Sequence, residues 1–265
     1  MSTQYTDFPS SADMAPEFAS DRALQFVTAM SRAPEARCCE LNAFRDTLNS
    51  LAVRDCSVIV DLGAGNGFLS RQVLPAYLCL DGVIYAVDVS NEMASAALEH
   101  PKVRWSLANL DSLPHASSSV DLVVSLAAFH HVLHKKQVLQ EVKRVLKPGS
   151  YLVVADVHDN TPSQLFIDTI VKRHCSTGHD FDFVDEDWML LLSNKVGMTH
   201  ISTTIVVTPW RFNSDAELFD FVQRLFDLRV PIDKLREEMR EIVPFCESDA
   251  IYLPWQLGYH VFKKP

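Results

Sequence analysis

The sequence predicts an α/β protein built on a mostly parallel sheet, and two observations carry this prediction. Short apolar runs at residues 57–60, 83–87, 103–107, 119–125 and 151–156 have the length of buried strands. Segments with helical spacing of apolar residues separate most of these runs. This alternation is typical of a sheet with helices on both faces.

A glycine-rich loop follows the first of these strands. Gly63, Gly65 and Gly67 are three of the chain's 8 glycines, and glycine is sparse elsewhere. The cluster indicates a backbone with positive φ angles or a ligand in close approach. The third glycine comes one position earlier than in the dinucleotide fingerprint, and Asp61 at the loop entrance would repel a diphosphate. The loop therefore favours a ligand with an ammonium or sulfonium group over NAD.

The run Asp61-Leu62-Gly63-Ala64-Gly65-Asn66-Gly67 resembles motif I, D/E-x-G-x-G-x-G, of the class I S-adenosylmethionine-dependent methyltransferases. The likeness covers residues 51–156 well. Residues 141–149 read E-V-K-R-V-L-K-P-G, a string familiar in the ubiquinone/menaquinone-type subgroup of small-molecule methyltransferases. The resemblance implies a Rossmann-like, seven-stranded, mostly parallel sheet. It also implies S-adenosyl-L-methionine as cofactor and S-adenosyl-L-homocysteine as product.

The next candidate ligand-binding residue is an acid at the end of the second strand. Asp88 can hydrogen-bond both ribose hydroxyls of an adenosine ligand, given its spacing from the glycine loop. The resemblance implies that Val89 and Met93 lie near the adenine. Asn109 stands where the family often has an acid, and its amide oxygen can still accept a bond from the adenine amino group. The expected cofactor-binding residues are Asp61, Gly63, Ala64, Gly65, Gly67, Asp88, Val89, Met93, Asn109, Leu110 and Ser125.

Two histidines follow the fourth strand. His130 and His131 stand at the carboxyl end of a central strand, where ligands bind in open parallel sheets. We expect one of them to act as a general base or to contact the substrate. Asp156, at the end of the fifth strand, is a further candidate base. No metal is expected, because no carboxylate or cysteine pattern accompanies the i, i+4 pair of His130 and His134.

The remaining segments divide the chain. We expect a mobile N-terminus at residues 1–15, a helical lid at 16–52 and a methyltransferase domain at 53–265, with a helical insertion around 208–250 before the last strand. The N-terminal helices either cover the sheet or close over the ligand. The aromatic residues beyond residue 161 either pack the insertion or line an apolar acceptor pocket.

Composition and charge disfavour several functions. The 265 residues carry a formal net charge of -10, which disfavours nucleic acid as a partner. Neither a signal peptide nor an apolar stretch of the roughly 20 residues needed to span a membrane is visible. The 6 cysteines form no C-x-x-C, so we expect reduced thiols in a cytoplasmic protein, either monomer or homodimer.

Together these features predict transfer of a methyl group from S-adenosylmethionine to O, N or C of a small, apolar or aromatic metabolite. The alternative is a protein that binds S-adenosylmethionine without methyl transfer, such as a regulatory partner or a cyclase. An NAD-dependent oxidoreductase is disfavoured by the loop spacing and by Asp61.

Overall fold

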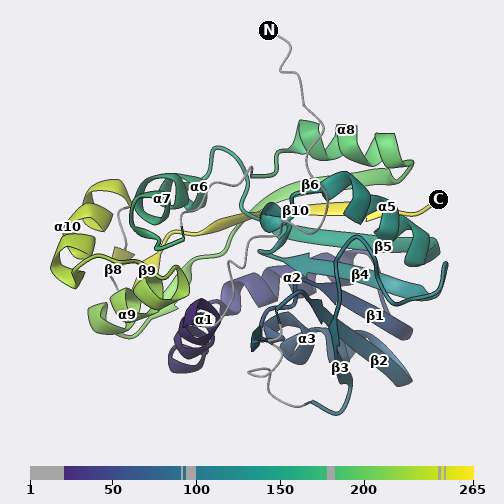
Figure 1. Ribbon diagram of the computed structural model, residues 1–265, viewed down its shortest axis with the longest axis horizontal. Helices are drawn as coiled ribbons and strands as arrows, with labels where there is room; N and C mark the ends of the chain where they lie inside the picture. The colour runs from purple at the N-terminus through teal and green to yellow at the C-terminus, as the bar shows by residue number, and fades with distance from the viewer. Residues whose placement is uncertain (1–20, 91, 94–99, 178–182, 244–245, 248) are drawn as a thin grey trace, which may run out of the picture.

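The centre of the molecule is a seven-stranded sheet with the strand order β3-β2-β1-β4-β5-β10-β6 (Figure 1). The structure is a computed structural model that describes residues 21–90, 92–93, 100–177, 183–243, 246–247 and 249–265. The strands are β1 (Cys56–Leu62), β2 (Leu78–Asp88), β3 (Val103–Leu107), β4 (Val120–Leu126), β5 (Leu146–Asp156), β6 (Thr199–Val207) and β10 (Gln256–Lys263). The first five strands are parallel, and β10 runs antiparallel to β5 and β6. The predicted mostly parallel α/β sheet is confirmed, whereas the segment expected at residues 1–15 lies outside the described residues.

Helices cover both faces of the sheet (Figure 1). Because successive strand residues point to opposite faces, Ile59 and Val60 belong to two different apolar clusters. The first cluster includes Phe44 of α2 (Cys38–Ser50) and Leu69 of α3 (Phe68–Gln72), and the second includes Leu139 of α5 (Lys135–Val145). Helix α8 (Glu186–Val196) packs with α5 on the second face. Burial on both faces explains why the central strands are almost continuously apolar.

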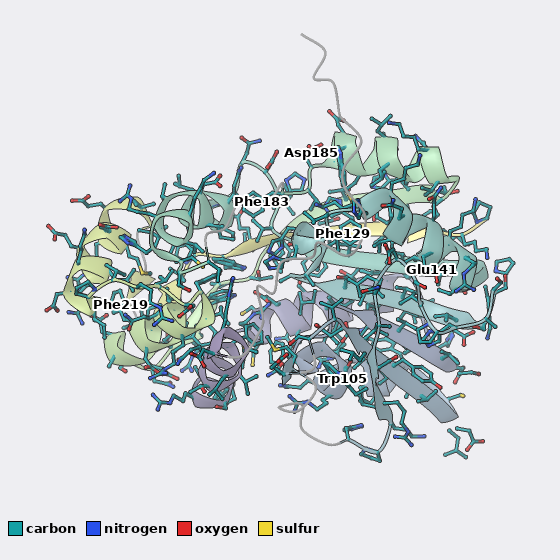
Figure 2. The ribbon with its side chains drawn as sticks, in the orientation of Figure 1. Trp105, Phe129, Glu141, Phe183, Asp185 and Phe219 are labelled. Atoms are coloured by element: carbon teal, nitrogen blue, oxygen red, sulfur yellow. The ribbon has the colours of Figure 1, made fainter. Side chains whose placement is uncertain are left out.

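The insertion before β10 lies beyond one end of the sheet. It holds α9 (Asp215–Leu225) and α10 (Ile232–Ile242). It also contains a second sheet, β7-β9-β8, that the sequence pattern does not predict. Its strands are β7 (Trp210–Phe212), β8 (Cys246–Glu247) and β9 (Ile251–Leu253), which are too short to show alternation. Figure 2 shows Phe219 inside this insertion and Trp105 on β3, at the opposite edge of the main sheet.

The N-terminal helix α1 (Asp21–Arg32) packs against α9 of the insertion (Figure 1). Arg32 pairs with Asp220 at 3.2 Å, and Arg224 donates to Gln25 at 2.6 Å. These contacts hold helix α1 against the insertion, over the carboxyl ends of the parallel strands.

One helical segment after β5 is interrupted. It consists of α6 (Pro162–Phe166), the π-helical turn η4 (Ile167–Val171) and α7 (Lys172–His174). A π turn inside a helix often marks a functional site. Two short 3-10 turns, η2 (Leu74–Tyr77) and η3 (Phe129–His131), follow α3 and β4. Within the described ranges, no helix combines the length and the hydropathy required to cross a bilayer.

Candidate active site

The glycine loop after β1 has backbone φ angles that residues with a side chain rarely adopt. Gly63, Gly65 and Gly67 have φ angles of 65°, 54° and 77°, in the left-handed region. A Cβ atom on Gly63 would also lie only 2.5 Å from the Cβ of Ala128. The loop is tied to the end of β2, because the N–H of Gly63 donates to the carbonyl of Val87 at 2.9 Å.

Asp88 fixes the loop from the neighbouring strand. Its Oδ2 accepts a hydrogen bond from the N–H of Gly65 at 2.9 Å, and its Oδ1 accepts one from the N–H of Ser90 at 2.9 Å. Burial raises the pKa of Asp88, while these hydrogen bonds oppose the shift. The carboxylate therefore positions the loop in addition to facing any ligand.

Asp61 lies beneath the loop with only 1% of its surface exposed. Its Oδ2 accepts a hydrogen bond from Oγ of Ser70 at 2.6 Å. Burial, and then the nearby charge of Asp88, raise the pKa of Asp61 to about 7, although the bond from Ser70 opposes the shift. A cation beside Asp61 would stabilise its ionised form.

These elements enclose a cavity, which we call the cofactor cavity. Eight of the expected cofactor residues line it, namely Asp61, Gly63, Ala64, Gly65, Asp88, Val89, Met93 and Leu110. Its other wall residues are Phe26, Arg37, Asn66, Phe68, Leu69, Leu126, Ala127, Ala128, His131 and Val132. Sequence reasoning missed Phe26 and Arg37, because both come from N-terminal helical segments far from the glycine loop.

Three expected cofactor residues lie elsewhere. Ser125 is buried and donates from Oγ to the carbonyl of Leu62 at 3.0 Å, so its side chain joins two strands. Asn109 lines a separate small pocket beside His134. Gly67 is the N-cap residue of α3 and shapes the loop without lining the cavity.

A second cavity, which we call the acceptor cavity, lies between the sheet and the insertion. Its wall residues are Arg22, Phe26, Arg37, Ala127, His130, His131, Val157, Ile167, Trp210, Leu225, Phe226 and Trp255. Four of them, Phe26, Arg37, Ala127 and His131, also line the cofactor cavity. The two cavities therefore adjoin.

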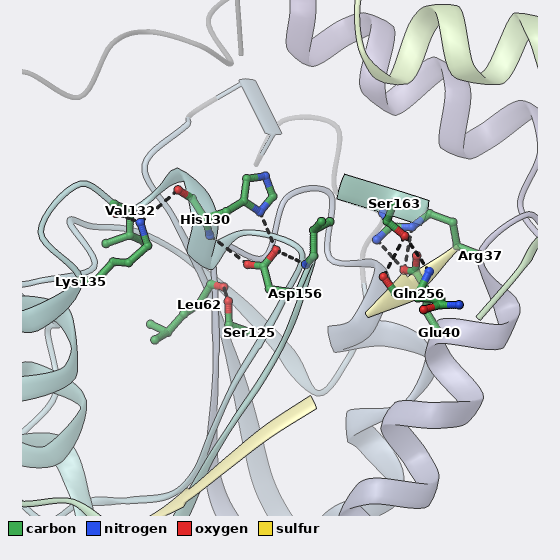
Figure 3. Close-up of polar contacts among 11 residues, drawn as sticks. Arg37, Glu40, Leu62, Ser125, His130, Val132, Lys135, Asp156, Ser163 and Gln256 are labelled. Atoms are coloured by element: carbon green, nitrogen blue, oxygen red, sulfur yellow. Dashed lines mark hydrogen bonds and ion pairs between the residues drawn. The ribbon is translucent and has the colours of Figure 1, made fainter. Parts of the chain in front are cut away.

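Aromatic rings form the insertion side of the acceptor cavity. The rings of Trp210 and Trp255 stack with centroids 4.0 Å apart, and Phe226 is stacked on Trp210 at 6.2 Å. A buried ion pair supports this wall: Glu40 accepts from Nη2 of Arg37 at 2.6 Å (Figure 3). Glu40 also accepts from Nε1 of Trp210 at 2.6 Å. Arg37 in turn lies against the Trp210 ring, 5.6 Å from its centroid.

His130 lies on the sheet side of the acceptor cavity and is backed by the fully buried Asp156 (Figure 3). Nδ1 of His130 lies 2.6 Å from Oδ1 of Asp156, and the backbone N–H of His130 donates to Oδ2 at 2.9 Å. The ring of His131 lies 3.9 Å from that of His130 and faces both cavities. The two expected histidines and Asp156 are thus brought together. No group of three potential metal ligands occurs in the described part of the chain.

Known proteins resemble this chain in sequence and in fold. Residues 60–154 match a family model described as a methyltransferase domain. Malonyl-acyl-carrier-protein O-methyltransferase 1 of Coxiella burnetii is 33% identical over 107 residues, which are 40% of this chain and 36% of that protein. O-methyltransferase resE of Aspergillus sclerotiorum is 27% identical over 204 residues, covering 76% of this chain and 66% of that protein.

The chain spans only 22% to 44% of the length of four curated relatives that it matches. The solved structure of BH2331 from Bacillus halodurans C-125 superimposes with a TM-score of 0.62 and 15% identity, covering 83% of this chain and 98% of that one, so it shares the fold. The glycine loop, Asp88 and strands β1, β4 and β5 all fall within or at the border of the matched segment. Residues 60–154 therefore match the methyltransferase-domain family, and the chain shares the fold of a solved structure described as a putative methyltransferase.

Proposed function

We propose that the chain transfers a methyl group from S-adenosylmethionine to a small aromatic or apolar acceptor. One observation carries this proposal: the cofactor cavity adjoins an aromatic cavity and shares Phe26, Arg37, Ala127 and His131 with it. Transfer between two bound molecules needs two sites that meet. A protein that only binds the cofactor needs the first site alone.

The walls of the cofactor cavity suit the two charges of the methionine half. Asp61 offers a carboxylate to its ammonium group. Arg37 offers a guanidinium to its carboxylate, and it is the one Lys or Arg among the described residues that line this cavity. The Asp61 carboxylate also disfavours a diphosphate, in agreement with the glycine spacing.

The adenosine half is supported by a different set of residues. Asp88 stands at the end of β2, where its carboxylate is available to the ribose hydroxyls, and Met93 and Leu110 supply apolar surface for the adenine. Gly63 and Gly65 leave the backbone open where a ligand would pass. When bound, the cofactor supplies an electrophilic methyl group on a sulfonium.

His130 is the residue that we assign as general base for an acceptor that keeps its proton. With Nδ1–H donating to Asp156, the neutral ring carries its lone pair on Nε2. A hydroxyl acceptor would form the new O–C bond while the C–S bond breaks with its electron pair left on sulfur, and the hydroxyl proton would pass to His130. Asp156 would then stabilise the imidazolium.

We also infer a lid role for α1 and α2 and a place among the ubiquinone/menaquinone-type small-molecule methyltransferases. Phe26 and Arg37, from the N-terminal helices and their connection, line both cavities, which supports closure over the ligands. The string at residues 141–149 supports the subgroup, and the net charge of -10 supports a small-molecule acceptor over nucleic acid. A cytoplasmic monomer or homodimer remains our proposal.

Two measurements test the function. Calorimetry with S-adenosylhomocysteine should show binding that Asp88→Ala weakens by at least tenfold, with NADH as the negative control ligand. Incubation with methyl-labelled cofactor and a metabolite extract should then place label in a small molecule. Cofactor binding without any labelled product would favour the alternative of a binding protein or a cyclase, and absence of cofactor binding would refute both.

A further inference from the structure

Most polar groups of the acceptor cavity are hydrogen-bond donors, which bears on the chemistry of the acceptor. The side chains of Arg22, Arg37 and Trp255 bring two guanidinium groups and an indole N–H to the wall, and the guanidinium of Arg37 is already paired with Glu40. Among the described wall residues there is no Asp or Glu side chain. The wall therefore offers hydrogen-bond donors, with the histidines as its only bases.

Trp255 is the most informative member of this set. Its side chain is 3% exposed, yet its Nε1–H has no hydrogen-bond partner among the described residues. A buried indole N–H normally finds an acceptor, and one without a partner calls for an explanation. Trp210, on which Trp255 stacks, differs because its Nε1–H is already bound to Glu40.

The shape of the wall adds a second constraint. Trp210, Trp255 and Phe226 present stacked or tilted rings, and Phe26 comes from α1. Flat aromatic molecules pack well against such surfaces. An aromatic wall can also attract a cation, but no carboxylate among the described wall residues is placed to pair with one, so an amine acceptor is disfavoured.

We propose that the methyl acceptor is an aromatic hydroxyl compound with a second oxygen, a carbonyl or carboxylate, that accepts a hydrogen bond from Nε1 of Trp255. This inference rests on the proposed methyl transfer and narrows it to an oxygen atom. The methylated hydroxyl faces His130 on the sheet side, and the second oxygen faces the insertion. A phenol keeps its proton near neutral pH, which gives the His130–Asp156 pair a function that an already deprotonated acceptor would not require.

The test uses four probes that share one ring: 3,4-dihydroxybenzoate, 3,4-dihydroxybenzaldehyde, catechol and dopamine. Binding is measured by calorimetry on the full chain saturated with S-adenosylhomocysteine, and methyl transfer is measured by mass spectrometry. We expect the benzoate and the aldehyde to bind about tenfold tighter than catechol. Dopamine should bind more weakly than catechol, and any methyl group gained should lie on oxygen.

Trp255→Phe keeps the ring and removes the N–H. It should weaken binding of the benzoate and the aldehyde about tenfold, which corresponds to about 1.4 kcal/mol, and leave catechol unchanged. Trp105→Phe is the matched control, because the Nε1–H of Trp105 also lacks a described partner but lies on β3 outside both cavities. It should change no affinity.

Three outcomes would overturn the proposal: dopamine binding as tightly as the benzoate, Trp255→Phe affecting all probes equally, or no probe binding to protein that holds S-adenosylhomocysteine. The comparison of the four probes on the unaltered chain decides the matter even if Trp255→Phe does not fold. In each of these outcomes cofactor binding still stands, so a wrong acceptor class is distinguished from a wrong function.

Discussion

Nδ1 of His130 and Oδ1 of Asp156 lie 2.6 Å apart and join the segments that end β4 and β5. Asp156 also accepts hydrogen bonds from the backbone N–H groups of His130 and Val157. Its burial would raise its pKa, but the charge of His130 and these hydrogen bonds together lower the pKa below its ordinary value. The pair therefore holds an ionised carboxylate against an imidazole at the edge of the acceptor cavity.

The first prediction concerns this pair. His130→Asn should lower kcat by about 10²-fold to 10³-fold with a smaller change in KM, because a positioned base contributes that much. Asp156→Asn should lower kcat through the same step, so the double variant should be little worse than His130→Asn. Asp168→Asn, on an exposed position of η4, is the control.

A purely structural role for the pair makes a different prediction. Both His130→Asn and Asp156→Asn would then lower the thermal midpoint and leave kcat per folded molecule unchanged. That result would remove His130 from the catalytic assignment.

The second prediction follows from the pKa of Asp61, which is raised to about 7. An unfolded aspartate loses its proton near pH 4, so between pH 4 and 7 the folded protein holds a proton that the unfolded chain has lost. Stability should therefore fall as pH rises through this window and level off above it. Thermal unfolding of the free protein should show this decline, and Asp61→Asn should reduce it.

Cofactor binding should show the opposite trend with pH. An ammonium group prefers ionised Asp61, so the Kd of S-adenosylhomocysteine should fall about fivefold from pH 6 to pH 7. Calorimetry in buffers of different ionisation heat should detect the proton released on binding. A Kd that is independent of pH, or one that keeps its dependence in Asp61→Asn, would contradict this role for Asp61.

The parts of the site that the sequence predicted share one property: their residues are close together along the chain. The loop from Asp61 to Gly67 and the acid at Asp88 belong to one strand-loop-helix-strand unit, so spacing alone indicates how they meet. The strands around them were predictable because burial on both faces makes them apolar.

The sequence left open whether the late aromatic residues line an acceptor pocket, and it could not identify the individual wall residues for the opposite reason. Arg37 and Trp210 are far apart in sequence, and they meet through Glu40 only after the insertion has folded against the N-terminal helices. In the sequence, Arg37 and Glu40 look like an ordinary i, i+3 surface pair. Phe26 and Trp255 carried no local pattern that separates a cavity wall from a packed core.

The third prediction distinguishes two reasons why position 63 requires glycine: its positive φ angle and its close contact with Ala128. Gly63 and Gly149 have φ angles of 65° and 79°, but a Cβ would clash with Ala128 only at Gly63 and would meet nothing within 4 Å at Gly149. Gly149→Ala should cost about 1–2 kcal/mol of unfolding free energy from the backbone alone. Gly63→Ala should cost more and should abolish binding of S-adenosylhomocysteine. Equal losses in the two variants, with cofactor binding retained, would show that the contact with Ala128 is unimportant.

The fourth prediction concerns the polar support of the aromatic wall. Glu40 is fully buried, and its Oε1 accepts its hydrogen bond from Nε1 of Trp210. Trp210→Phe would leave that oxygen without its donor, which should lower the unfolding free energy by about 1–3 kcal/mol beyond the loss of ring area. Trp188→Phe, on α8 at the other face of the sheet, is the control for ring area alone.

Chemical denaturation gives the comparison, and the double variant Trp210→Phe with Glu40→Gln tests the cause. An amide can turn its NH₂ group toward a different acceptor and carries no charge that needs a donor, so this second change should recover part of the loss. If it deepens the loss instead, the contribution of Glu40 lies in its pairing with Arg37, and the aromatic wall depends on that ion pair more than on the indole bond.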